Sequence, residues 1–253
     1  MPLTPVQYCD TVASETRRLT DLAKDADLKT PIPTCPPWDL VGLLKHIGAI
    51  HRWASRMVQE CAQERLDFKQ LDLGLPADTS GYPAWFAAGG EQLVATLRAA
   101  DPSMAMWAWG ADKHALFWAR RMAHETGVHR ADAELALGRE PSFEASIAID
   151  GIDEFLENLP HAGYFAPNVN ELRDAGATIH FHCTDADGEW LIELQPDGFT
   201  WQHGHGKGSA AVRGTAADLL LLLYGRRKFA EPGRFEVFGD SAVLDRWFAS
   251  AHI

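Results

Sequence analysis

The chain has 253 residues, of which 46 % are hydrophobic and 23 % are charged, and these ordinary globular values argue against disorder, collagen-like repeats and coiled coil. Its net charge of −12 disfavours a nucleic-acid backbone or an anionic membrane as the main partner. The longest apolar run, from Leu219 to Tyr224, is far shorter than the roughly 20 residues of a membrane span. The length suits one large domain or two small ones.

The cysteines and the N-terminus indicate where the protein works. Cys9, Cys35, Cys61 and Cys183 are widely scattered and form no C-x-x-C pair, which is typical of reduced thiols rather than of a disulfide framework. The first ten residues lack a basic stretch followed by an apolar one, so no secretory signal is visible. We therefore expect a soluble protein of the cytosol.

The first half of the chain predicts helices. Apolar residues recur at helical spacing in the first two of four expected helical segments, and a cluster of prolines at 31–37 separates these two. Four helices joined by moderate connections indicate a bundle. In chain order, the expected helices are Thr4 to about Lys24, Trp38 or Asp39 to about Glu64, Ala84 to Ala100, and Asp112 to Leu137.

The second half changes to a period of two. A short helix is expected from Asp150 to Leu159, followed by three strands in an antiparallel meander with Asp-Gly turns. The fold class is therefore α+β, with a helix bundle in residues 1–145 and a small α/β domain with an antiparallel sheet in residues 146–253. The remaining expected elements are strands at 177–184, 190–194, 199–201 and 234–238, a helix at 215–224, and a last helix from Ser241.

The fourth predicted helix carries a candidate metal site. Glu125 and His129 are four residues apart, so they project from one face, which also holds Trp118 and Met122. An amphipathic helix buries such a face, and a buried carboxylate needs a cation or hydrogen-bond donors. The pattern is not the H-E-x-x-H of zinc proteases, because His124-Glu125 is followed by histidine one position too late.

The second predicted helix offers a matching ligand. His46 shares a face with apolar residues, whereas His51 lies about 140° round the helix and is expected to point mostly outward. Two imidazoles and one carboxylate leave an open coordination position, which is typical of a catalytic divalent metal: zinc, or nickel, iron or cobalt. The alternative is a set of ordinary hydrogen-bonded core residues. On the predicted strand 177–184, His180 and His182 share one face and are expected to be solvent-exposed, and the run 203–208 is expected to be a flexible turn.

Several motifs are distributed along most of the chain. They are Thr34-Cys35-Pro36-Pro37-Trp38-Asp39-Leu40, Leu43-Leu44-Lys45-His46, His51-Arg52-Trp53, the run 121–130, Asp150-Gly151-Ile152-Asp153-Glu154-Phe155, the run 212–220, and Tyr224-Gly225-Arg226. Together these motifs resemble one known family, that of the mycothiol-dependent maleylpyruvate isomerases, and they occur in the family's order. Pro37 and Tyr224 depart from the family pattern, which usually has glycine and tryptophan there.

The resemblance implies a DinB-like four-helix bundle followed by a small α/β domain. Its metal ligands correspond to His46, Glu125 and His129, the residues that helical geometry selects. Mycothiol is then the thiol cosubstrate, and the metal generates its nucleophilic sulfur.

The thiol cofactor and an acidic substrate need cationic partners. Arg226 and Arg213, near the ends of the helix 215–224, are the candidates, at a cleft expected between the domains. Arg121 is expected to face the metal. Asp132 is expected either to orient His129 or, alternatively, to be a solvent-exposed helix residue.

The reaction stays open between classes. The resemblance implies addition of mycothiol to a small electrophilic substrate, either as a cis–trans isomerase or as a thiol S-transferase. One alternative is a non-catalytic module in which the metal is structural or absent, acting as a binding or regulatory partner. Another is a metal-dependent hydrolase that uses the bound water directly. Dependence on a thiol separates the first class from the other two.

Overall fold

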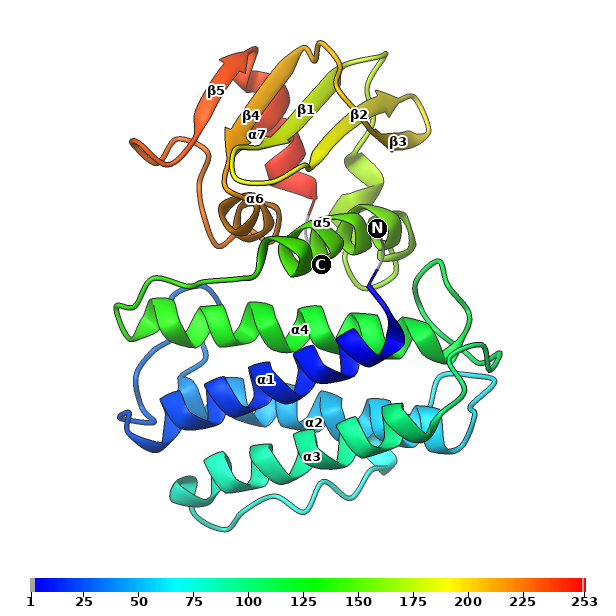
Figure 1. The fold of residues 1–253 in the computed structure, drawn as a ribbon, viewed down its shortest axis with the longest axis vertical. Helices are drawn as coiled ribbons and strands as arrows, with labels where there is room; N and C mark the ends of the chain where they lie inside the picture. The colour runs from blue at the N-terminus through cyan, green and yellow to red at the C-terminus, as the bar shows by residue number, and fades with distance from the viewer. Residues whose placement is uncertain (1–2, 252) are drawn as a thin grey trace. The chain divides into compact units, whose positions relative to one another are not determined.

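The structure is a computed structural model that describes residues 3–251 and 253, and it divides into two compact units, 1–141 and 142–253. The first unit is helical and the second contains a sheet, so the predicted fold class is confirmed. The unit boundary lies a few residues before the expected one. In the first unit (Figure 1) the long helices are α1 (Pro5–Lys24), α2 (Leu40–Gln59), α3 (Tyr82–Ala99) and α4 (Ala115–Ala136), with short 3-10 helices η1 (Phe68–Gln70) and η2 (Thr79–Gly81).

Local sequence sets where the helices begin and end. Thr4 and Gln7 form a reciprocal capping box at the start of α1, and the Asp39 side chain accepts the Gly42 N–H at the start of α2. Helix α2 ends at Gln59, short of the predicted Glu64. The chain turns away there because Cys61 adopts a left-handed conformation with φ 45°.

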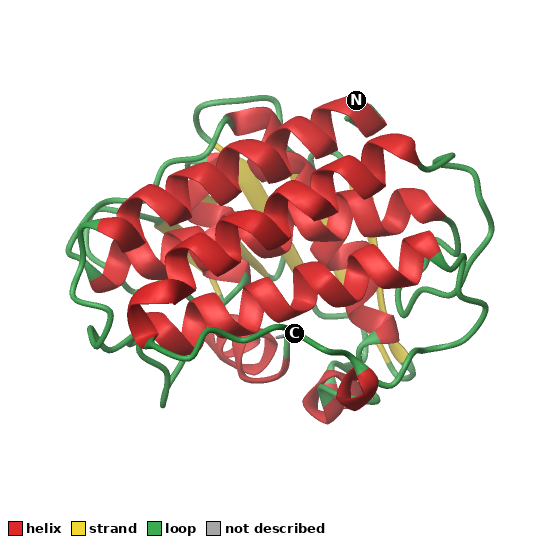
Figure 2. Ribbon diagram, turned by 90° about the horizontal axis from the view of Figure 1, so that it is seen from below, coloured by secondary structure: helices red, strands yellow, loops and turns green. Residues whose placement is uncertain are grey.

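The four helices pack side by side (Figure 2), with α1 and α2 each in contact with both α3 and α4. Close approach of α2 to α3 depends on Gly48, since a Cβ there would lie 2.3 Å from the Trp85 ring. The core between them is built from fully buried aliphatic and aromatic side chains such as Leu44 and Phe86. Among residues 3–251 and 253, no helix has both the length and the apolar character needed to cross a membrane.

The second unit is built on one five-stranded sheet in the order β3-β2-β1-β4-β5 (Figure 1). The expected meander is present in β1–β3, but β4 lies parallel to β1, so the sheet is only mostly antiparallel. Strand β4 was not predicted. The elements are α5 (Ala145–Asn158), η3 (Leu159–His161), η4 (Pro167–Glu171), β1 (Thr178–Cys183), β2 (Glu189–Gln195), β3 (Gly198–His203), β4 (Ala210–Gly214), α6 (Ala216–Leu223), β5 (Glu236–Gly239) and α7 (Ser241–Ser250).

The two faces of the sheet differ in chemistry. Ile179 and Phe181 of β1 are fully buried, and Phe181 contacts Phe248 of α7, so this face meets the helices. His180 and His182 point to the opposite face. The prediction that both are solvent-exposed is wrong, because His180 is only 5 % exposed and His182 is half-buried. The ring of His205, in the loop after β3, lies 5.1 Å from the His180 ring.

Candidate metal centre

Helices α2 and α4 bring the three predicted ligands together. His46 lies in the second turn of α2, while Glu125 and His129 lie one turn apart on α4. Nε2 of His46 and Nε2 of His129 are each 3.4 Å from Oε1 of Glu125, and the two rings are 5.0 Å apart. We call His46, Glu125 and His129 the bundle site.

The bundle site is sheltered on one side and open on the other. The His129 side chain is 9 % exposed, whereas those of His46 and Glu125 are 31 % and 23 % exposed. A small molecule can therefore approach the carboxylate and the first imidazole, while the second imidazole is fixed in the interior. One ligand atom from each of the three residues lies within 4.8 Å of the others.

Two buried side chains hold the ligands from behind. Nη2 of Arg121, a residue with 4 % side-chain exposure, donates to Oε2 of Glu125 at 3.1 Å, as predicted for a residue facing the site. Oδ2 of Asp132 lies 2.8 Å from Nδ1 of His129. Asp132 is fully buried, so its interpretation as a solvated residue is wrong. Because Nδ1 of His129 donates to Asp132, Nε2 is the ring nitrogen that faces Glu125 and the site.

The proline-rich segment 31–38 supplies a further layer that sequence reasoning did not place. The Thr34 hydroxyl donates to Asp132 at 2.6 Å, and the Cys35 thiol donates to the same carboxylate at 3.4 Å. Trp38 lies over the His46 ring at 4.6 Å. Cys35, His129 and Asp132 also form a set of potential ligands of their own. The Cys-Pro-Pro-Trp motif drew attention to this segment in the sequence, but it did not predict which residues the segment contacts.

Electrostatics in the bundle site favour a carboxylate beside an imidazolium when no ion is bound. Burial acts to raise the pKa of Glu125, but hydrogen bonds from His129 and His46 and the charge of Arg121 hold it well below its usual range. Burial acts to lower the pKa of His129, but its contacts with Asp132, Cys35 and Glu125 hold it well above the usual range. A metal cation must therefore displace a proton from His129.

His51 does not behave as expected. The prediction that it points outward is wrong, because its side chain is fully buried and lies 2.9 Å from the Thr126 hydroxyl. Helix α2 is covered on more than one side by α3 and α4, so a residue well round from His46 still meets protein.

The two arginines of the second unit lie in defined local settings. Arg213 belongs to β4 and pairs with Glu236 of β5 at 2.8 Å. Arg226 follows α6 and donates from Nη1 to the Tyr224 carbonyl at 2.7 Å. Their roles toward a thiol or a substrate stay predictions.

The donor set of the bundle site fits a divalent transition metal. Two imidazole nitrogens and one carboxylate oxygen are the ligands that zinc accepts in catalytic sites, where a fourth position stays open. Calcium and magnesium prefer all-oxygen sets. The buried Arg121 and Asp132 orient Glu125 and His129, which is the support that metal ligands generally have.

Fold and site together define a two-unit protein in which a helix bundle with a candidate metal site precedes an α/β unit. Residues 9–134 match the family model for the mycothiol maleylpyruvate isomerase N-terminal domain, and residues 146–246 match the model for the C-terminal domain of the same family. The two models account for most of the chain. The chain belongs to the mycothiol maleylpyruvate isomerase family, as its motifs indicated.

Solved structures agree at the level of the fold. Two crystal structures of a mycothiol-dependent maleylpyruvate isomerase, one of them a mutant form, match with TM-scores of 0.61 and 0.64. Each match covers 93 % of both chains at 11 % sequence identity, a level at which the likeness speaks for the fold. No curated protein matches the sequence.

Proposed function

We propose that this chain is a mycothiol-dependent isomerase of the cytosol, in which His46, Glu125 and His129 hold one divalent metal, zinc by preference. The observation that carries the proposal is the meeting of three ligand atoms within 4.8 Å on two helices. The family and its name support the thiol and the isomerase reaction. The substrate is a small electrophilic molecule, and neither nucleic acid nor membrane is a partner.

An ordinary thiol in water has a pKa of about 8.5. When bound, the metal would lower the pKa of a thiol that coordinates it. The protein contributes orientation. Arg121 holds one oxygen of Glu125, which leaves the other directed at both imidazoles. Asp132 fixes the tautomer of His129, and Trp38 limits rotation of the His46 ring. The half-exposed side of the site admits the thiol.

The isomerase reaction requires no net change in atoms or electrons. The thiolate sulfur adds to an activated cis double bond, so that the bond between the two carbons becomes single and rotates. Elimination of the same thiolate then restores the double bond in the trans arrangement. An S-transferase would instead keep the adduct. Arg226 and Arg213 remain our candidates for pairing with the acidic groups of mycothiol or substrate.

The proposal is tested with cobalt-substituted protein, whose visible spectrum reports the metal's ligands. Mycothiol should change the spectrum of the wild type, because its sulfur would join the ligands of the metal that His46, Glu125 and His129 would hold. His46→Ala should bind one equivalent less metal and lose both the spectral response and the isomerisation of a cis-unsaturated keto acid. His114→Gln, a change at an exposed histidine of the same unit, is the matched control and should retain all three.

The outcomes separate the reaction classes. An unchanged spectrum of the wild type with mycothiol would favour a non-catalytic module or a hydrolase. A trans product with mycothiol recovered unchanged identifies an isomerase, whereas a stable thioether identifies an S-transferase. Equal metal content in His46→Ala and the wild type would contradict metal binding at the bundle site.

A further inference from the structure

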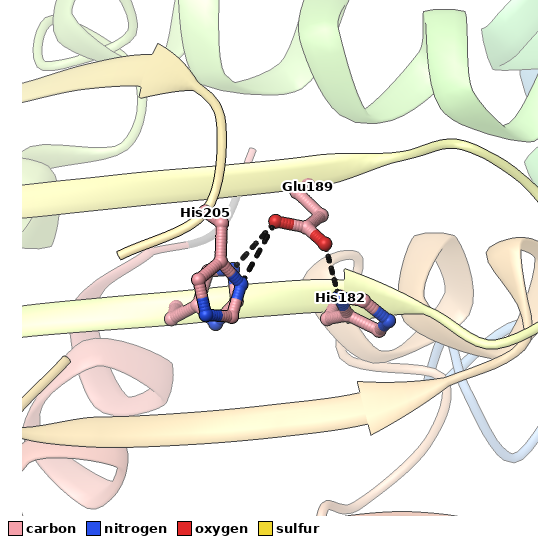
Figure 3. Close-up of side chains that lie close together, drawn as sticks. His182, Glu189 and His205 are labelled. Atoms are coloured by element: carbon pink, nitrogen blue, oxygen red, sulfur yellow. Dashed lines mark hydrogen bonds and ion pairs between the residues drawn. The ribbon is translucent and has the colours of Figure 1, made fainter. Parts of the chain in front are cut away.

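Three histidines and one glutamate gather on the second unit, on the face of the sheet opposite α7. His180 and His182 come from β1, Glu189 begins β2, and His205 lies in the loop after β3. We call these four residues the sheet site. Figure 3 shows His182 and His205 directed at the carboxylate of Glu189. None of the four belongs to the bundle site.

The four side chains are close enough to share an ion. Oε1 of Glu189 lies 2.6 Å from Nδ1 of His182, and Oε2 lies 3.2 Å from Nδ1 of His205 and 3.4 Å from Nε2 of His180. One ligand atom from each residue lies within 4.8 Å of the other three. Ligands of a tetrahedral zinc ion are about 3.4 Å apart at bond lengths near 2.1 Å, so small side-chain rotations close the site.

The backbone positions these ligands before any ion binds. Glu189 stands directly opposite His182 in the antiparallel pair β1–β2, which fixes this contact by strand register. The loop after β3 lies tightly on β1: a Cβ at Gly208 would lie 2.4 Å from the Ala210 carbonyl and 3.0 Å from the His180 nitrogen. The glycine at 208 therefore lets the loop lie on β1, where the His205 ring is 5.1 Å from the His180 ring.

An ordinary ion pair does not account for the cluster. One protonated imidazole is enough to neutralise Glu189, yet three imidazoles surround it. Nε2 of His180 is buried and makes no hydrogen bond, although it lies 3.4 Å from Oε2 of Glu189. Because His180 is only 5 % exposed, water does not solvate Nε2 in place of a hydrogen-bond partner.

We propose that His180, His182, Glu189 and His205 bind a second divalent transition metal, of the zinc class, which fastens the loop 204–209 to the sheet. Three nitrogen ligands and one oxygen ligand are unsuited to calcium or magnesium. Four protein ligands complete a tetrahedron and leave no open position, so the site is structural rather than catalytic. It is independent of the function proposed for the bundle site.

Metal counting tests the proposal on the full-length protein without a histidine tag. After removal of bound metal with a chelator, dialysis against Zn²⁺ should load two equivalents in the wild type and one in His205→Ala. His205 is 79 % exposed, so its replacement leaves the fold intact. His161→Ala, at an exposed position outside the cluster, is the control and should load two. Full loading of His205→Ala would overturn the proposal.

The same experiment keeps the two sites apart. His46→Ala should also load one equivalent, and the His46→Ala/His205→Ala double variant should load none. If His46→Ala loads two equivalents, the bundle site fails while the sheet site stands. His182→Ala should behave like His205→Ala. Loss of a residue that only hydrogen-bonds a metal ligand lowers metal affinity ~10–100-fold, and loss of the ligand His182 should lower zinc affinity by more than this.

Proteolysis gives a readout that does not depend on stoichiometry. Lys207 is an exposed trypsin site inside the loop 204–209. Zn²⁺ should slow cleavage after Lys207 in the wild type, because the fastened loop cannot enter the protease, and should have no such effect in His205→Ala. Equal cleavage with and without Zn²⁺ in the wild type would contradict a metal-fastened loop.

Discussion

His51 shows what a single buried titratable group does to the stability of the bundle. Its side chain has no exposure, and it stacks on Phe86 while it contacts the Thr126 hydroxyl. Burial, opposed by the charge of Glu125, lowers the pKa of His51 from 6.5 to about 3. The folded protein therefore keeps this imidazole neutral under conditions in which the unfolded chain protonates it.

The consequence is a loss of stability on acidification. Because the folded pKa of His51 lies below the unfolded one, the unfolded state binds more protons between pH 6.5 and 3, and the free energy of unfolding falls as the pH falls through this window. At pH 5 the loss is about 2 kcal/mol, at ~1.4 kcal/mol per pH unit. His51→Gln should lack this loss.

Urea unfolding of metal-free protein at pH 7.5 and pH 5 measures the effect. The variant should be less stable than the wild type at pH 7.5 by about 1–3 kcal/mol, the cost of a disturbed buried hydrogen bond, and the gap should shrink by about 2 kcal/mol at pH 5. The exposed His161→Gln variant should stay level with the wild type at both values. A gap that does not depend on pH would contradict a neutral buried His51.

Residue-level inference from the sequence succeeded where helical geometry was sufficient. His46, Glu125 and His129 were selected because each shares a helix face with apolar residues, and they do meet. Asp132 and Thr34 could not be joined, since their contact links residues 98 positions apart through an irregular segment. His51 was misjudged because a bundle helix buries more than one stripe.

At the level of elements, α2 and α3 approach each other closely at Gly48, two residues after His46. A Cβ on Gly48 would lie 2.3 Å and 2.9 Å from two atoms of the Trp85 ring, which is rigid and itself only 8 % exposed. Gly48→Ala gains roughly 1 kcal/mol of helix propensity, but overpacking in a full core costs about 1–3 kcal/mol. We expect net destabilisation of up to about 2 kcal/mol and weaker metal binding at His46, two residues away.

A double-mutant cycle isolates this contact. In a Trp85→Leu background the added methyl group has room, so Gly48→Ala should there be neutral or stabilising, with a coupling energy of about 1–3 kcal/mol. Denaturant unfolding of the four proteins gives the value. Equal cost of Gly48→Ala in both backgrounds would show that Trp85 does not set the distance between α2 and α3.

Elements with a long repeating pattern were predictable, and short ones were not. Helices α1 and α4 were found nearly to their observed ends, because each is a long segment of five turns or more without an internal proline. Strand β4 has only five residues, Ala-Ala-Val-Arg-Gly, too few to show alternation. Its parallel pairing with β1 is a non-local choice that no local pattern encodes. Helix α5 starts at Ala145, before the predicted Asp150, because Asp150 is buried inside the helix rather than capping it.

At the scale of the whole molecule, each unit holds all the residues of one candidate metal site. The bundle site lies within residues 1–141, and the sheet site lies within residues 142–253. The first unit has its own apolar core. Two clusters of buried hydrophobic residues form this core, and all their members lie before residue 138. A unit of this size with its own core can fold by itself.

We therefore expect the fragments 1–141 and 142–253, produced separately, each to fold and to bind one equivalent of zinc. Binding to the native state alone stabilises a protein by about 2.7 kcal/mol at a ligand concentration 100-fold above Kd, so zinc should raise the melting temperature of each fragment. The His46→Ala change should abolish the shift only in the first fragment, and His205→Ala only in the second. A shift that survives the change in its own fragment would show that the ion binds elsewhere, whereas fragments that fold without any shift would show that neither cluster holds zinc.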